Sequence, residues 1–142
     1  VSSLDLSVQA QILNLMKSLQ KEFQLTTLFI SHDLNIIHYM SDRIIVMYMG
    51  EIVESGPCEE VYSRGRHPYT SILLSSLLDL STDGESGELK DSGDVVRGEN
   101  FCIYSNRCPQ STELCLRDKP ELKEVAPGHY VKCHYVGRNE EK

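Results

Sequence analysis

Residues 26–54 decide the fold, and they read TTLFISHDLNIIHYMSDRIIVMYMGEIVE. The first five residues are β-branched, apolar or aromatic and do not alternate with charged residues. They predict a strand buried on both faces, as in a parallel sheet. A polar turn, Ser31-His32-Asp33, follows at the carboxyl end of this strand. Since ligands bind at that end of the strands in open α/β sheets, His32 is the first candidate for a functional side chain.

The segments around this strand complete an α/β pattern. Apolar residues in 34–40 predict a short helix, and the β-rich runs 44–49 and 52–54 predict two strands joined by a tight Gly50-Glu51 turn. Gly56-Pro57 is expected to break the second of these strands. Helices are predicted for three further segments: residues 7–23, Pro57 to about Tyr62, and Pro68 to about Leu80. This order of elements predicts an α/β domain with a partly parallel sheet.

The composition is that of a soluble globular chain of about one domain. The 142 residues are 40% hydrophobic and 25% charged, and no apolar run approaches the ~20 residues of a membrane-spanning helix. A net charge of −7 disfavours attraction to nucleic-acid phosphate, so nucleic acid is not an expected partner. Val1 is not a methionine, and the first residues read as the end of a loop. A fragment of a longer protein is therefore expected.

The charge is distributed unevenly and divides the chain into segments. Residues 79–100 carry two basic and seven acidic residues, so −5 of the −7 lies in this stretch rich in Ser, Gly and Asp. So little apolar surface predicts a flexible linker. The expected segments are an α/β part at 1–56, a helical extension at 57–78, the acidic linker at 79–100, a cysteine-rich tail at 101–136 and a disordered terminus at 137–142.

Several ordered motifs together resemble one protein family. They are Val1-Ser2-Ser3-Leu4-Asp5, Phe29-Ile30-Ser31-His32-Asp33-Leu34, Ser41-Asp42-Arg43 with the strand after it, and His67-Pro68-Tyr69. The chain resembles the C-terminal part of an ABC-transporter ATP-binding subunit of the oligopeptide and dipeptide importers. The resemblance implies the C-terminal portion of a P-loop (ABC-type) nucleotide-binding domain, followed by a small, loop-rich, cysteine-containing extension.

The resemblance also implies which residues act at the nucleotide. Ser2, Ser3, Leu4 and Asp5 correspond to the D-loop, which crosses the interface of the ATPase dimer; Ser3 stands where the family usually has Ala. His32 corresponds to the switch histidine, a catalytic residue that hydrogen-bonds the γ-phosphate of ATP. From its position alone, a histidine that merely caps the following helix is the alternative.

Other parts of such an ATPase are absent from the sequence. It contains no Gly-x-x-x-x-Gly-Lys-Ser/Thr phosphate loop, no signature motif and no Asp-Glu pair for Mg²⁺. Because phosphoryl transfer needs these parts together, the chain alone is expected to be inactive, whereas the intact subunit would use ATP and Mg²⁺. The alternative is a stand-alone metal-binding regulatory or interaction module without ATPase activity.

The resemblance implies partners and a location as well. Such a subunit pairs with a second ABC ATPase subunit and with integral membrane permease subunits. Through them it serves an extracytoplasmic peptide-binding protein. The expected location is the cytoplasmic face of a prokaryotic cell membrane.

Four of the five cysteines lie in the tail: Cys102, Cys108, Cys115 and Cys133. From spacing alone, disulfides, structural zinc, an iron–sulfur cluster and unmetallated thiols all stay open, although the gaps are wider than the close Cys-x2-4-Cys pairs of zinc sites. Nothing signals secretion, which disfavours disulfides. The resembling importer subunits carry a similar tail implicated in [4Fe–4S] binding. Such a cluster is therefore preferred and zinc is the second choice.

The remaining histidines are expected to be structural: His38, His67, His129 and His134. Two of them, His129 and His134, flank Cys133, so a spare metal ligand is the alternative for either. His67-Pro68-Tyr69 is read as a helix start that shapes contact with the membrane subunit or with the tail.

Overall fold

The computed structural model describes residues 6–78 and 100–136, and its contacts divide the chain into two units, Val1–Ser41 and Asp42–Lys142. Each unit is described by itself. The predicted D-loop residues Ser2 to Asp5, nearly all of the acidic linker and the terminus at 137–142 lie outside the described residues. No helix in the described ranges is long and apolar enough to cross a membrane. The segment boundaries expected from composition stay a prediction.

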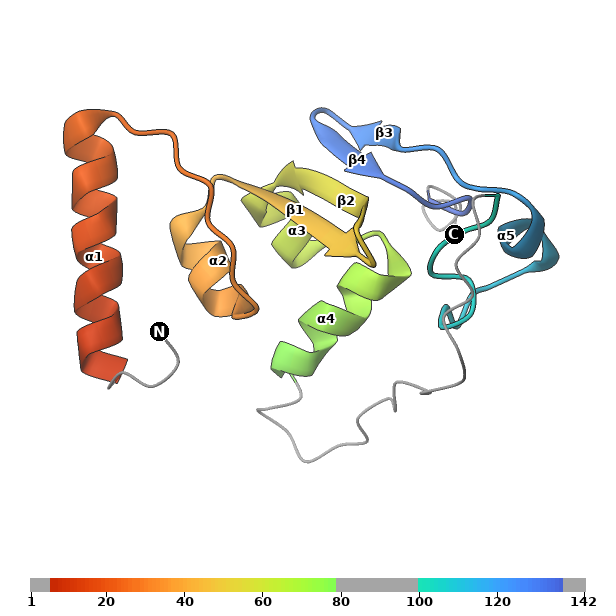
Figure 1. The fold of residues 1–142 in the computed structure, drawn as a ribbon, viewed down its shortest axis with the longest axis horizontal. Helices are drawn as coiled ribbons and strands as arrows, with labels where there is room; N and C mark the ends of the chain where they lie inside the picture. Colours follow the sequence, from red (N-terminus) through yellow and green to blue (C-terminus); the bar gives the residue numbers. More distant parts are fainter. Residues whose placement is uncertain (1–5, 79–99, 137–142) are drawn as a thin grey trace. The chain divides into compact units, whose positions relative to one another are not determined.

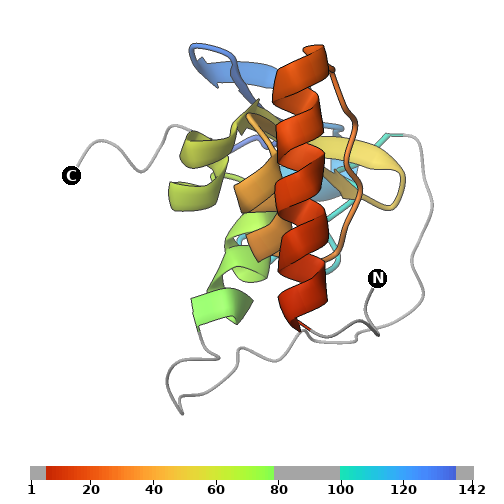
Figure 2. The same cartoon turned by 90° about the vertical axis from the view of Figure 1, so that its left-hand side faces the viewer.

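The first unit opens with helix α1, Leu6–Phe23, seen along its length in Figure 2. This confirms the helix predicted from the apolar periodicity of residues 7–23. The helix ends at Gln24, whose φ of 52° is left-handed, and the amide of Leu25 donates to the carbonyl of Gln20 at 3.0 Å. A left-handed residue followed by this backward bond is a common helix stop, since it satisfies a carbonyl of the last turn.

The strand predicted for Thr26–Ile30 is not formed, and this prediction was wrong. Residues 25–30 are irregular, and the side chains of Leu28 and Ile30 are each 85% exposed. A parallel strand exists only through ladder hydrogen bonds to its neighbours. No strand in the described ranges pairs with this run. An apolar composition alone therefore did not suffice to make a strand.

Helix α2, Leu34–Met40, begins where the sequence placed it. Asp33 caps it, because its Oδ1 accepts the amides of Asn35 at 3.0 Å and Ile36 at 3.2 Å. Within this unit, the hydroxyl of Tyr39 lies 2.5 Å from Oδ1 of Asn14. The Lys17 ammonium lies 4.1 Å from the centre of the Tyr39 ring. These contacts join α2 to α1.

The second unit contains a four-stranded sheet in the order β1-β2-β4-β3 (Figure 1). Its strands are β1 Arg43–Tyr48, β2 Glu51–Pro57, β3 Lys123–Ala126 and β4 His129–Val131. Every pairing in this sheet is antiparallel, so the predicted partly parallel sheet is wrong for the described residues. Met49 and Gly50, with φ of 48° and 87°, form the turn between β1 and β2. Two left-handed residues give a hairpin turn, which forces antiparallel pairing.

β2 runs through Gly56 and Pro57, where the sequence predicted a break. Gly56 pairs with Ile44, and Pro57 is the N-cap of helix α3, Cys58–Ser63, rather than its first residue. Proline has no backbone N–H to donate to a neighbouring strand. The strand tolerates it here because Pro57 is its last residue. Helix α4, Pro68–Leu78, begins as predicted.

The core of this unit joins the hairpin to the cysteine-rich tail. Its buried members are Tyr48, Val53, Cys102, Tyr104 and Cys115. The rings of Tyr48 and Tyr104 meet edge to face with centroids 5.0 Å apart. Cys115 lies on helix α5, Glu113–Arg117. The tail thus folds onto β1 and β2, and its last strand, β4, extends their sheet.

Candidate functional site

His32 is the one residue of the predicted nucleotide site that the structure describes. It is exposed and lies at a bend immediately before α2. The flanking residues fix the bend, because Ser31 Oγ accepts the amide of Asp33, which in turn caps the helix. His32 therefore follows an irregular segment and not the predicted strand. Asp33, and not His32, supplies the side-chain cap, so the turn leaves the imidazole exposed.

The four tail cysteines converge from separate segments to form what we call the four-cysteine centre. Cys102 and Cys115 are joined through their backbones, with the amide of Cys102 donating to the carbonyl of Cys115 at 2.9 Å. Cys108 follows the turn after Tyr104, and Cys133 follows β4. None of these four cysteines forms a disulfide in the described part of the chain.

The thiols of the four-cysteine centre influence one another's pKa. Burial raises the pKa of the Cys102, Cys108 and Cys133 thiols, and nearby thiols of the same centre raise it further. A thiol changes the pKa of another only over a short distance, since like charges then oppose each other's ionisation. The thiols of Cys102, Cys108 and Cys133 therefore lose their protons less readily than an exposed cysteine does.

Backbone amides point at three of these sulfurs. The amides of Tyr104 and Ser105 donate to Cys102, that of Gln110 to Cys108, and those of Tyr135 and Val136 to Cys133. Each of these bonds lowers the pKa of its thiol, against the larger effect of burial. Amides two or three residues along the chain that donate to sulfur favour the thiolate, which is the form that binds metals.

The centre is not arranged for a single metal ion. Among the described residues no group of three or more His, Cys, Asp or Glu side chains is placed to hold one. Zinc at about 2.3 Å from each sulfur would bring four sulfurs to within roughly 4 Å of one another. The histidines do not supply a spare ligand either. Nε2 of His134 lies 2.9 Å from the carbonyl of Asp118, and Nε2 of His129 lies against Glu54.

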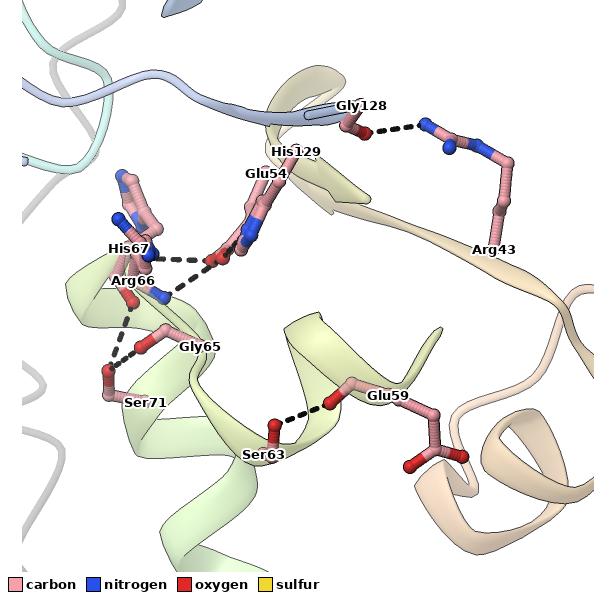
Figure 3. Close-up of polar contacts among 10 residues, drawn as sticks. All are labelled: Arg43, Glu54, Glu59, Ser63, Gly65, Arg66, His67, Ser71, Gly128 and His129. Atoms are coloured by element: carbon pink, nitrogen blue, oxygen red, sulfur yellow. Dashed lines mark hydrogen bonds and ion pairs between the residues drawn. The ribbon is translucent and has the colours of Figure 1, made fainter. Parts of the chain in front are cut away.

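A second buried centre, which the sequence did not reveal, surrounds Glu54 on β2 (Figure 3). Its side chain is fully buried. Oε1 accepts the amide of Arg66 at 2.9 Å and lies 2.7 Å from Nε2 of His129; Oε2 accepts the amide of His67 at 2.9 Å. We call these residues the Glu54 cluster. A buried carboxylate needs such donors, because its desolvation is otherwise very costly.

The Glu54 cluster explains the histidine of the His-Pro-Tyr motif. His67 is 2% exposed, and its Nδ1 accepts the amide of Tyr69 at 3.1 Å. Burial lowers the pKa of His67 to about 4, although the negative charge of Glu54 opposes this. The ring is therefore neutral at pH 7, and its role at the helix start is structural, as the sequence predicted. The signal that could have revealed Glu54 is an acidic residue directly after the apolar pair Ile52-Val53 in a predicted strand.

Comparison with known proteins identifies this second unit. Residues 53–115, which include Glu54, His67 and three of the four clustered cysteines, match the family model described as the C-terminal region of oligopeptide/dipeptide transporters. Residues 53–115 are therefore similar to that transporter C-terminal region. The resemblance predicted from the sequence motifs is thereby confirmed.

Curated relatives extend the transporter match to nearly the whole chain. The oligopeptide transport ATP-binding protein AppF of Bacillus subtilis is 44% identical over 142 residues, covering 94% of this chain and 42% of the relative. A Brucella ovis protein with the provisional name peptide import ATP-binding protein is 42% identical, covering 94% and 43%. The dipeptide transport ATP-binding protein DppF of Haemophilus influenzae is 37% identical, covering 96% and 42%. The chain spans less than half the length of these relatives.

Proposed function

We propose that this chain is the C-terminal part of an ATP-hydrolysing subunit that powers uptake of oligopeptides or dipeptides by an ABC importer. The observation that carries this proposal is the match of about 94% of the chain to proteins named for ATP binding and peptide transport. The alternative, a stand-alone metal-binding module, is not favoured, because these relatives extend well beyond the chain and are named as ATP-binding proteins.

His32 would act at the nucleotide in the intact subunit. An exposed imidazole on a bend that Ser31 and Asp33 hold in place can donate a hydrogen bond to the γ-phosphate without refolding. Ser2, Ser3, Leu4 and Asp5 would contribute the D-loop across the dimer. Mg²⁺ and the phosphates would be bound by residues that this sequence lacks, so the chain alone would not hydrolyse ATP.

The four-cysteine centre would hold a [4Fe–4S] cluster, with zinc as the second choice. The convergence of Cys102, Cys108, Cys115 and Cys133 supports this, as do the amides that donate to three of the sulfurs. When bound, such a cluster supplies a one-electron redox centre beside the His-Pro-Tyr helix.

The proposed partners follow from the same function. They are a second ATPase subunit, identical or related, and membrane permease subunits that receive peptide from an extracytoplasmic binding protein. The subunit would then work at the cytoplasmic face of the membrane of a prokaryotic cell. Nucleic acid is not a proposed partner, since the net charge is −7.

The test is ATP hydrolysis by the full-length subunit from which this chain derives, assembled with its permease. His32→Ala should lower the rate at least about 100-fold, the scale expected for losing a donor to the developing charge. Asp33→Asn is the matched control on the same turn, because it keeps a helix-capping oxygen. Hydrolysis by the His32→Ala protein at the rate of Asp33→Asn would contradict the assigned role of His32. A wild-type complex that neither hydrolyses ATP nor takes up peptide would overturn the proposed function.

A further inference from the structure

Helix α1 carries an apolar stripe along one side. Five of its residues follow one another at steps of three or four positions, which at 3.6 residues per turn places their side chains on the same side of the helix. Each of the five is between 38% and 62% exposed, and they are Val8, Ile12, Leu15, Leu19 and Phe23. We call these residues the α1 stripe.

The contacts between α1 and α2 lie on a different side of the helix. Asn14 bonds to the hydroxyl of Tyr39 at 2.5 Å, and the Lys17 ammonium lies 4.1 Å from the centre of the same ring. At about 100° per residue, Lys17 lies roughly 160° around the helix from the middle of the α1 stripe. These two contacts therefore hold α2 against α1 and leave the stripe exposed.

An uncovered stripe of this kind indicates an interface. An amphipathic helix takes most of its stability from packing its apolar side against other parts of a protein. Soluble proteins rarely expose a contiguous apolar patch unless it binds something. Because all five side chains are apolar, they fit an apolar protein surface and not a charged ligand such as a phosphate group.

The comparisons indicate which protein provides that surface. Residues 53–115 are similar to a transporter C-terminal region, and the matches that cover 94% of this chain cover only 42–43% of the relatives. Since the matched region is C-terminal, most of the additional length of such a subunit is expected to precede it. A segment of the same polypeptide stays tethered near α1 at an effective concentration in the millimolar range. Tethering favours that segment over a second copy or a separate subunit.

We propose that the α1 stripe is the surface on which the preceding, ATP-binding part of the same polypeptide packs. The inference rests on the proposed function, because it takes this chain to be part of a longer subunit. It adds which side of α1 forms the junction. The side that carries Lys17 and Lys21 stays outside this junction, so α1 is held by α2 on one side and by the preceding segment on the other.

Alkylation of introduced cysteines tests the junction in the full-length subunit, purified without its permease. Leu15→Cys probes the middle of the α1 stripe, and Lys21→Cys is the matched control on the other side of the same helix. The thiol at position 15 should react at least about 10-fold more slowly than that at position 21, because the covering segment must open before the reagent enters. Peptide mass spectrometry distinguishes both sites from the native cysteines.

Leu19→Cys is the second variant, in case Leu15→Cys does not fold, and it should be protected to the same degree. Equal alkylation rates on the two sides of α1 would overturn the inference. If the subunit with its permease does not hydrolyse ATP, the proposed function fails, while the alkylation rates still decide whether the stripe is covered.

A photocrosslinker identifies the segment that covers the stripe. Phe23, the most exposed member, is replaced by p-benzoylphenylalanine in the full-length subunit, which is irradiated alone and together with its permease. The crosslink should form within one polypeptide, independently of protein concentration, to a peptide that precedes residue 1 of this chain. A crosslink to a second copy or to the permease, or no crosslink at all, contradicts the proposal.

Discussion

Glu54 and His129 lie 75 residues apart in the sequence and 2.7 Å apart in the structure, with both side chains fully buried. The bond crosses from the hairpin strand β2 to β4, the last strand of the tail. Because the same carboxylate also accepts the amides of Arg66 and His67, one side chain fixes three segments. The start of the helix with the His-Pro-Tyr motif is thus held by a long-range contact, because Glu54 accepts the backbone amide of His67, the residue before Pro68.

Replacing Glu54 by Gln should destabilise the protein. The side-chain NH2 group of glutamine would face one of the donors that now bond to a carboxylate oxygen, which are two backbone amides and the imidazole of His129. At least one of these buried donors would then lose its acceptor. The expected loss in the free energy of unfolding is about 1–3 kcal/mol, measured by urea denaturation. Glu113→Gln is the matched control, since its ion pair with Arg117 is exposed and should contribute less than about 1 kcal/mol. Equal stabilities of the two variants would contradict this account.

Stability should also fall as the pH falls, because of His67. The pKa of this ring is lowered from 6.5 to about 4 by burial, so the unfolded chain takes up a proton first as the pH decreases. The contribution of His67 is fully present above pH 6.5, is lost between about pH 6.5 and 4, and changes no further below that range. At pH 5 the loss should be about 2 kcal/mol. Urea midpoints at pH 7.5 and 5.0 measure it.

His67→Gln provides the control for this pH dependence, because it removes the titrating group while keeping an acceptor for the amide of Tyr69. The difference in unfolding free energy between pH 7.5 and 5.0 should be smaller in this variant by about 2 kcal/mol. If His67→Gln loses as much stability as wild type, other groups cause the effect.

The sequence predicted those parts of the fold that depend on neighbouring residues. The periodicity of residues 7–23 predicted α1, and Pro68 marked the start of α4, because both signals are local. The strand predicted for Thr26–Ile30 does not form, because a strand requires neighbouring strands to pair with. The apolar run has the same sequence pattern whether or not such neighbours are present. The expected parallel pairing failed with it, because that expectation rested on the same apolar run.

The candidate sites show the same division. Asp33 and the turn at His32 are readable from a few adjacent residues, and the four cysteines are visible as a group. The role of Glu54 cannot be read in this way. The sequence shows an acidic residue in a predicted strand, but it does not show the hydrogen-bond donors that allow the carboxylate to be buried. Those donors come from residues 66, 67 and 129, which only the folded chain brings together.

A last prediction concerns Gly56, which makes room for the His129 ring. A Cβ at this position would lie 3.0 Å from the ring and 3.1 Å from a methyl of Val61, and both neighbours are fully buried, so neither can move aside freely. Gly56→Ala should therefore lower the free energy of unfolding by about 1–3 kcal/mol. Gly50→Ala separates crowding from backbone strain, since Gly50 has open space around its Cβ position but a φ of 87°. It should cost about 1 kcal/mol with no change at His129. The two mechanisms differ in the His129 ring resonances, which should shift in Gly56→Ala alone; unchanged resonances there would show that the ring does not depend on this glycine.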